Sequence, residues 1–283
     1  TMAKVRKKSE QKSKLKFGGR FDEQCGSLVF RYPGGKSRRS VRDKVLSFFP
    51  KHYNSYREPM VGGGGIFFAI PNNKERWIND KDEHLVSVYR AFQERPEEFI
   101  EKCRKIEAPK DGEPLTSAKP NGKPLYNARL KAIFDRCAVE GLEPDQAFRY
   151  FFVHRTVWAG RVNYDLESRM YFSNPNGWNI VHTNKMTQTR DKLVGVKITC
   201  GEYQPLLSRP GTNVLVYLDP PYYLNTELAP NSRLYRHNFD FNDHVVLRDA
   251  IMACEHKIVL SYDDHPKVRE LYSDPMFEIH SES

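Results

Sequence analysis

The stretch "EPMVGGGGIFFAIPNNKERWIND", Glu58–Asp80, has the pattern of a strand end, a glycine turn, a helical start and a second strand. The apolar turn "YNSYREP" (Tyr53–Pro59) leads into "MVGGGGIFFAI", where a strand is expected to end, and the helix is expected to begin at Ile66–Ile70. Four consecutive glycines permit positive φ angles and let a ligand approach the backbone closely. The following segment, "EHLVSVYRAFQ", has apolar residues at helical spacing. We therefore predict a β-α-β-α unit here.

The same alternation returns in the last third of the chain. Strands are expected at "VKITCGEY" (Val196–Tyr203), "NVLVYLDPPYY" (Asn213–Tyr223) and "KIVLSYD" (Lys257–Asp263), and "NDHVVLRDAIMACEH" between the last two has helical spacing. Alternating strands and helices form an open, mostly parallel sheet with helices on both faces. The sequence therefore predicts the α/β fold class.

Residues 96–192 interrupt this alternation with a helical and then irregular pattern. Helices are expected around Ala128–Cys137 and from Asp145 to Val157. We interpret this block as an inserted, mainly helical domain. Residues 25–95 and 193–283 are then the two parts of one α/β domain.

The net charge of +9 is concentrated at the start of the chain, where eight of the first 20 residues are Lys or Arg and only Glu10 is acidic. We expect residues 1–24 to be a basic, disordered tail that can follow a polyanion. A solubilising extension explains the charge run equally well.

The five cysteines are scattered and form no C-x-x-C pair, which argues against a disulfide framework or a zinc site. No apolar run approaches the roughly 20 residues of a membrane span. We therefore expect a soluble, cytoplasmic protein that needs no metal.

Ligands of open parallel sheets bind at the carboxyl ends of the strands. The glycine run does not match the dinucleotide pattern, because its third glycine would fall at position 67, where the chain has Phe67. Asp80 closes the next strand and is placed to accept hydrogen bonds from ribose hydroxyls. Glycines and acid together suit an adenosine-containing cofactor without a pyrophosphate, although a simple tight turn also explains a glycine run.

The segment "RYPGGKSRR" (Arg31–Arg39) ends like a phosphate-binding loop. The Walker pattern would require glycine at position 30, where the chain has Phe30. Lys36 is therefore better suited to the carboxylate of an amino-acid-bearing cofactor, with Tyr32 packed beside it.

The tetrapeptide "DPPY", Asp219–Tyr222, directly follows an apolar strand. Two prolines make the turn rigid and remove two backbone donors, which leaves carbonyl oxygens beside a carboxylate and an aromatic ring. These groups match an exocyclic amine: Asp219 and a proline carbonyl accept its hydrogens, and Tyr222 stacks on the base. A simple strand-ending turn is the structural alternative.

The ordered set RYPGGK, EPMVGGGG, "WINDKDEHL" and DPPY, with a long insert before DPPY, resembles the Dam-like (class alpha, D12) DNA adenine-N6 methyltransferases. The resemblance extends to "FFVHRTVWAGRVNYDLESRMYFSNPNGW", "CGEY", "YRHNF" and "LSYDDHPKVRELY". It implies a Rossmann-like S-adenosylmethionine-dependent methyltransferase domain at 25–95 and 193–283, and a target-recognition domain at 96–192. The cofactor-binding residues that it implies are Tyr32, Lys36, Glu58, Pro59, Gly62, Gly64, Asp80, Tyr203 and Asp219.

For the reaction we expect direct in-line methyl transfer to adenine N6, with Asp219, Pro220, Pro221 and Tyr222 at the catalytic site and neither a metal nor a covalent intermediate. A paired adenine cannot reach such a pocket, so it should be flipped out of double-stranded DNA. The loop Asn225–Phe239 is a candidate cover for the flipped base, with Tyr235 and His237 as candidate DNA contacts.

Target recognition is expected in the turn "HRTVWAGRVNYD". Arg155 and Arg161 can bind phosphate or guanine, Asn163 can read adenine, and Trp158 can wedge between bases. Core packing of Trp158 and a backbone-holding role for Arg155 are the alternatives. Relatives that recognise GATC usually carry leucine and arginine where this chain has Arg161 and Asn163, so GATC is not the expected site.

Three other functions stay open: a cytosine-N4 methyltransferase, an RNA adenine methyltransferase and an inactive DNA-binding relative. The first usually carries Ser, and RNA enzymes usually carry Asn, at the position of Asp219, so the aspartate favours DNA adenine. A cognate restriction endonuclease is a candidate partner, and the protein is expected to be a monomer or weak dimer. We expect a cytoplasmic location, associated with the nucleoid through DNA, or the host cytoplasm if a phage encodes the enzyme. Relatives usually continue through one more strand after the apparent strand in "FEIHSES".

Overall fold

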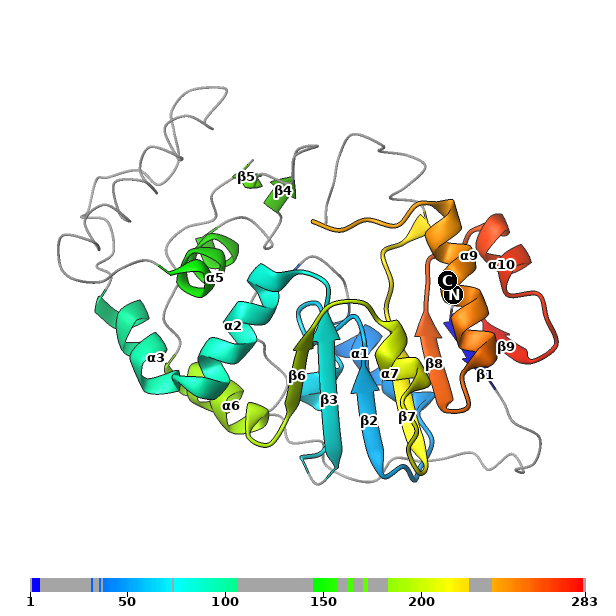
Figure 1. Ribbon diagram of the computed structural model, residues 1–283, viewed down its shortest axis with the longest axis horizontal. Coiled ribbons are helices and arrows are strands. Elements are labelled where there is room, and N and C mark those ends of the chain that lie inside the picture. The colour runs from blue at the N-terminus through cyan, green and yellow to red at the C-terminus, as the bar shows by residue number, and fades with distance from the viewer. Residues whose placement is uncertain are drawn as a thin grey trace.

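The computed structural model describes residues 2–5, 32, 36, 38–72, 74–105, 145–156, 162–164, 170–172, 183–223 and 236–281. Its centre is a seven-stranded sheet in the order β6-β3-β2-β7-β8-β1-β9, in which the five strands from β6 to β8 are parallel (Figure 1). This confirms the predicted α/β class. The strands are β1 Met2–Val5, β2 Ser55–Glu58, β3 Glu75–Asp80, β6 Lys197–Cys200, β7 Val214–Leu218, β8 Lys257–Ser261 and β9 Phe277–His280.

Strand β7 is buried along its whole length because helices cover both faces of the sheet. Its side chains alternate between two hydrophobic clusters. Leu215 and Tyr217 face the cluster that contains helices α1 and α2, whereas Val214, Val216 and Leu218 face the cluster that contains α7, α9 and α10. The helices of these two layers are α1 Arg39–Ser47, α2 Glu83–Glu94, α7 Gln204–Ser208, α9 Phe241–Ala253 and α10 Pro266–Leu271.

The helix expected from Ile66 is only a short 3-10 turn, η1, at Phe67–Ala69. Ile70 has extended backbone angles, with φ −79° and ψ 157°. Pro71 follows it, and a proline disfavours the helical conformation of the residue before it. The turn therefore ends after one cycle and leads directly into β3.

The block expected to be inserted contributes three described helices and a small ribbon. Helices α3, α5 and α6 gather around α2 at the β6 edge of the sheet (Figure 1). The rings of Phe92 on α2, Phe99 on α3 and Phe151 on α5 pack edge to face, with centroids 4.9–5.8 Å apart. These helices therefore share one hydrophobic core with the sheet. Their bounds are α3 Pro96–Lys105, α5 Gln146–Thr156 and α6 Thr183–Leu193, and the ribbon is β4 Val162–Tyr164 with β5 Met170–Phe172. The expected helix at Ala128–Cys137 lies outside the described residues.

The start of the chain differs from the expectation of a disordered tail, which was wrong for Met2–Val5. These residues form β1, which pairs antiparallel with both β8 and β9. Met2 lies opposite Ser261 on one side and opposite His280 on the other. Without β1, the edges of β8 and β9 that face each other would carry unpaired backbone N–H and C=O groups. Strand β1 forms hydrogen bonds with both of these edges.

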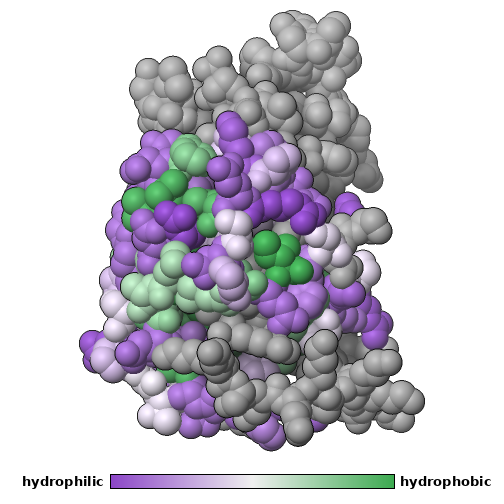
Figure 2. Space-filling view, turned by 90° about the vertical axis from the view of Figure 1, so that its right-hand side faces the viewer, coloured by the Kyte–Doolittle hydropathy of each residue, from purple (hydrophilic) through white to green (hydrophobic). Residues whose placement is uncertain are grey.

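The surface on the side of α10 and β9 is mainly hydrophilic, with separate hydrophobic patches (Figure 2). Phe241, Val246 and Met252 of α9 are exposed apolar residues of the described surface. Among the described residues, no helix is both long and apolar enough to cross a membrane.

Candidate active site

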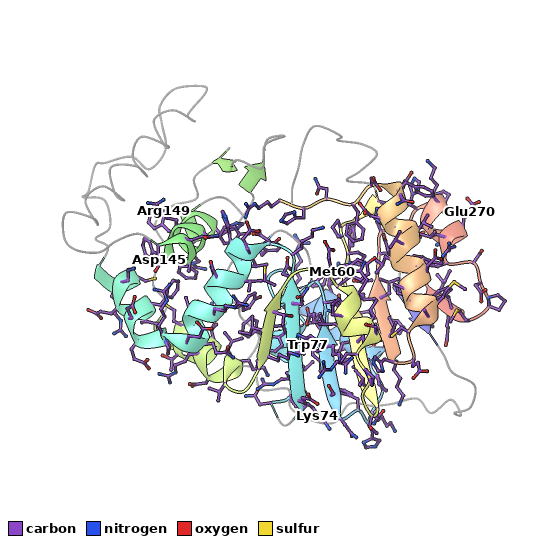
Figure 3. The ribbon with its side chains drawn as sticks, in the orientation of Figure 1. Met60, Lys74, Trp77, Asp145, Arg149 and Glu270 are labelled. Atoms are coloured by element: carbon purple, nitrogen blue, oxygen red, sulfur yellow. The ribbon has the colours of Figure 1, made fainter. Side chains whose placement is uncertain are left out.

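The predicted cofactor-binding residues and the DPPY turn gather at the carboxyl ends of the parallel strands. Met60, just after β2, marks this end of the sheet, and Lys74, just before β3, marks the opposite end (Figure 3). The β4–β5 ribbon lies beyond the same carboxyl ends (Figure 1). The site is therefore built where loops from β2, β3, β6, β7 and β8 meet.

The loop after β2 is shaped by glycines that no other residue could replace without strain. Gly62 and Gly64 have φ angles of +48° and +69°. A Cβ at Gly64 would lie 2.8 Å from the hydroxyl of Tyr89, and a Cβ at Gly62 would lie 3.2 Å from the ring of Tyr32. Tyr89 also donates a 2.7 Å hydrogen bond to the Gly62 carbonyl. The loop thus presents bare backbone beneath Tyr32.

Asp80 closes β3 and is held by the backbone. Its Oδ2 accepts a hydrogen bond from Gly62 N (2.9 Å), and its Oδ1 accepts one from Asp82 N (3.0 Å). Burial raises the pKa of this carboxyl to about 6, and the two backbone donors only partly offset that rise. The glycine loop and the acid of the next strand therefore form one unit, as the sequence predicted.

Glu58 and Pro59, at the end of β2, lie beneath this loop. Glu58 is only 2% exposed, and the Tyr56 hydroxyl donates a 2.5 Å hydrogen bond to its Oε2. Burial, and secondarily the charges of Asp219 and Asp80, raises the pKa of Glu58 well above its ordinary value. The Pro59 carbonyl accepts from Asn79 Nδ2 at 3.0 Å. Both residues therefore lie below the surface that a ligand would meet, and they support the loop from behind.

Tyr203 follows β6 and is the N-cap residue of α7. It is buried, which raises its pKa to about 12, and its ring centroid lies 6.3 Å from that of Phe239. Phe239 belongs to the segment that enters α9. The two rings form an aromatic wall beside the carboxyl end of β6.

The DPPY turn after β7 is held by side chains. Asp219 Oδ1 accepts hydrogen bonds from Lys36 Nζ (2.5 Å) and Ser261 Oγ (2.8 Å). Lys36 also donates to the Tyr222 hydroxyl, and its Nζ lies 4.3 Å from the centroid of the Tyr222 ring. Pro220 is buried and Pro221 partly exposed. Lys36, which lies just before α1, thus connects that part of the chain to the DPPY turn.

Two residues that support this turn were missed as site residues. Ser261 ends β8 and binds Asp219, while Asp263 accepts a 3.1 Å hydrogen bond from Tyr223 N. The Tyr222 ring also stacks on Tyr262, with centroids 6.3 Å apart. Because β8 is the parallel neighbour of β7, the polar end of "KIVLSYD" was the available signal.

The predicted DNA contacts are only partly described. Arg155 is 3% exposed at the end of α5, a position that favours the backbone-holding alternative. Asn163 lies in β4 opposite Tyr171, and His237 Nε2 lies 3.8 Å from Glu83 Oε2. Trp158, Arg161 and Tyr235 fall outside the described residues.

No group of three or more His, Cys, Asp or Glu residues suited to a metal ion occurs within the described ranges. Within the described ranges, Cys103, Cys200 and Cys254 form no disulfide.

Comparison with known proteins agrees with this architecture. A type II methyltransferase of Lactococcus lactis subsp. cremoris, M1.LlaDCHI, is 27% identical over 259 residues, which cover 88% of this chain and 85% of the relative. The DNA N-6-adenine-methyltransferase of Escherichia phage P1 is 22% identical over 89% of this chain but only 32% of its own length. The type II methyltransferase M.MjaIII of Methanocaldococcus jannaschii is 22% identical over 77% of this chain and 76% of the relative.

Residues 32–283 match the family described as D12 class N6 adenine-specific DNA methyltransferase. Because this match covers most of the chain and includes both aspartates at the strand ends, the protein belongs to the D12 class of N6 adenine-specific DNA methyltransferases.

Proposed function

We propose that this enzyme moves a methyl group from S-adenosylmethionine directly to N6 of an adenine that has been flipped out of duplex DNA. Family membership supports the donor, the acceptor atom and DNA as substrate. The geometry at the carboxyl edge of the sheet supports the roles that we propose for individual residues.

The residues around the glycine loop fit S-adenosylmethionine. Gly62 and Gly64 let the loop turn with positive φ while Tyr32 and Tyr89 pack directly against it, and Asp80 is bonded to the same loop. Asp80 would accept hydrogen bonds from the ribose hydroxyls, Tyr203 would pack against the adenine of the cofactor, and Lys36 would meet its carboxylate beside Tyr32. When bound, S-adenosylmethionine supplies a methyl group that its sulfonium already activates.

Asp219 and the Pro220 carbonyl would each accept a hydrogen bond from one N–H of the substrate amine. The amine of adenine is a poor nucleophile because its lone pair is delocalised into the ring. Two acceptors on its hydrogens favour a pyramidal nitrogen and stabilise the positive charge that grows during transfer. Tyr222 would stack on the extruded base, and stacking on an aromatic ring returns about 1–3 kcal/mol of the cost of flipping. Fixing both reactants in attack geometry can supply about 7–11 kcal/mol of the barrier.

Lys36 connects the two halves of the proposed site. In the structure it donates to Asp219, the acceptor that the adenine amine would use. We infer that Lys36 turns from Asp219 toward the cofactor carboxylate when both substrates bind. One lysine would then serve the cofactor and also keep the proposed catalytic carboxylate paired before DNA arrives.

One observation carries the proposal: Lys36 and Asp219, 183 positions apart in the chain, are 2.5 Å from each other at the sheet edge that also carries Asp80. We further propose that the enzyme acts in the cytoplasm as a monomer or weak dimer, and the two type II relatives make a cognate restriction endonuclease the candidate partner.

The test is incubation of the protein with labelled S-adenosylmethionine and mixed-sequence duplex DNA, followed by digestion to nucleosides. Label is expected in N6-methyladenine alone. The same assay with RNA and with single-stranded DNA compares the substrate classes. Label in N4-methylcytosine, or label in RNA but not in duplex DNA, would overturn the proposal.

A further inference from the structure

We propose that Asp82 is a positioning residue that couples the cofactor site to helix α5 of the inserted block and to the segment that enters α9. This inference rests on the proposed function, because it concerns how binding of DNA and binding of S-adenosylmethionine influence each other. Asp82 is 3% exposed and acts through its protein neighbours.

Asp82 is linked to the cofactor site through Asp80. Its backbone N–H donates to Asp80 Oδ1 at 3.0 Å, and this bond fixes one of the two oxygens of the proposed ribose acceptor. The side chain of Asp82 caps α2, since its Oδ1 accepts from the N–H groups of His84 (3.0 Å) and Leu85 (3.4 Å). The position of Asp80 is therefore tied to the start of α2.

The second oxygen of Asp82 binds the inserted block. Tyr150, on α5, donates a 2.7 Å hydrogen bond to Asp82 Oδ2. A helix cap needs only one side-chain oxygen, which Asn or Ser supplies as well as Asp does. The buried bond to Tyr150 is thus additional to capping and joins residues 68 positions apart.

Helix α5 reaches the cofactor site by a second route. His154 lies one turn after Tyr150, with ring centroids 4.4 Å apart. The His154 ring also stacks on Tyr32, at 5.8 Å and an interplanar angle of 20°. Tyr32 in turn covers Gly62 of the glycine loop. Any shift of α5 that accompanies DNA binding therefore acts on both sides of the proposed cofactor site.

Arg236 brings the third segment to the same carboxylate. Its Nη1 lies 2.6 Å from Glu83 Oε1 and 3.7 Å from Asp82 Oδ1, and its side chain is 18% exposed. Arg236 begins the described segment that follows the DPPY turn and enters α9. Asp82 consequently contacts a strand end and the inserted block, and it lies 3.7 Å from Arg236 of the segment after DPPY, whose nearer partner is Glu83.

Two variants separate positioning from capping. Tyr150→Phe removes only the bond from α5, and Asp82→Asn keeps an oxygen for the cap but loses the charge. Tyr272→Phe is the matched control, because the Tyr272 hydroxyl is buried and has no hydrogen-bond partner in the described structure.

The measurement is calorimetric binding of S-adenosylhomocysteine, with and without a duplex that carries the sequence methylated by the wild type. In the wild type, we expect DNA to tighten this binding by about fivefold or more, a typical size for coupling between two sites. In Tyr150→Phe and Asp82→Asn, DNA should tighten S-adenosylhomocysteine binding by less than about twofold. The affinity of these variants without DNA should stay within about twofold of the wild-type affinity. Tyr272→Phe should keep the wild-type factor, and the double variant of Asp82 and Tyr150 should lose no more coupling than either single variant, because both remove the same link.

Independent binding of the two ligands by the wild type, or full coupling in Tyr150→Phe and Asp82→Asn, would overturn the inference. Equal loss of affinity with and without DNA would also overturn it, because that result describes a purely structural cap. A wild type that makes no N6-methyladenine would instead refute the proposed function, so the two failures can be told apart.

Discussion

Two aspartates close neighbouring parts of the same sheet edge, yet they are held in different ways. Asp80, after β3, is fixed by backbone N–H groups of Gly62 and Asp82. Asp219, after β7, is fixed by the side chains of Lys36 and Ser261. Backbone donors belong to the fold and cannot turn away, whereas a lysine can change partner by rotating its side chain.

This difference matches the proposed tasks. A carboxylate that binds the ribose of a cofactor needs one fixed orientation. A carboxylate that must exchange one cationic partner for the amine of a substrate needs a partner that can leave. The comparison teaches that, under the proposed function, the rigid acid would bind the cofactor and the adjustable acid would accept a hydrogen bond from the substrate amine.

The largest expected effect on the rate of methyl transfer comes from removing Asp219, the acid that side chains hold in place. Asp219→Ala removes an acceptor aimed at charge that develops during transfer, a kind of group whose loss typically costs about 10²–10³ in rate. Because Lys36 also loses its partner, we expect transfer to fall by at least about 10³-fold while DNA binding, measured by fluorescence anisotropy, stays within about threefold.

The matched control is Asp249→Ala, which removes an exposed aspartate from α9. It should methylate DNA at the wild-type rate. Retained turnover in Asp219→Ala would show that this carboxylate is not the acceptor of the adenine amine.

The next effect concerns the backbone-held acid and depends on pH. Since burial raises the pKa of Asp80 to about 6, its carboxyl takes up a proton as the pH falls through about 6. Ribose hydroxyls donate best to the ionised form. We therefore expect the affinity for S-adenosylhomocysteine to weaken by about tenfold between pH 7 and pH 5, as measured by calorimetry.

The effect of Asp80 on the free energy of unfolding should have the opposite pH dependence to its effect on cofactor affinity. A folded pKa above the unfolded value stabilises the unliganded protein at low pH, and this contribution is lost as the pH rises from about 4 through about 6. Asp80→Asn cannot titrate, so it should show neither trend relative to the wild type. A wild type and an Asp80→Asn variant with parallel pH profiles would contradict the assignment.

The smallest effect tests how Asp219 is held. Ser261→Ala removes one donor, and one hydrogen bond contributes about 1 kcal/mol, so we expect an approximately fivefold lower kcat in steady-state assays. Ser261→Thr keeps a hydroxyl and is the conservative comparison. A change confined to KM for the cofactor would place Ser261 with the cofactor instead of with the transfer step.

Much of the sheet could be predicted because its strands carry strong local signals. ERWIND is strand β3 without a shift, and NVLVYL contains β7, whose apolar side chains face both hydrophobic layers. The meeting of Asp80 with the glycine loop followed from the rule that parallel strands end at one edge. Ser261 and Asp263 were missed because serine and aspartate after a strand are common turn residues, and only the pairing of β8 with β7 gives them a role.

The sequence by itself determined the alternation of parallel strands and helices, the glycine turn, the rigid DPPY corner and the family. Only the tertiary structure decided that Met2–Val5 complete the sheet between β8 and β9, that Lys36 meets Asp219, and that α5 contacts Asp82 and Tyr32. The reason is physical: turn chemistry and hydrophobic period act over a few residues, whereas contacts between distant segments depend on how completed layers pack and on which buried polar groups still need partners.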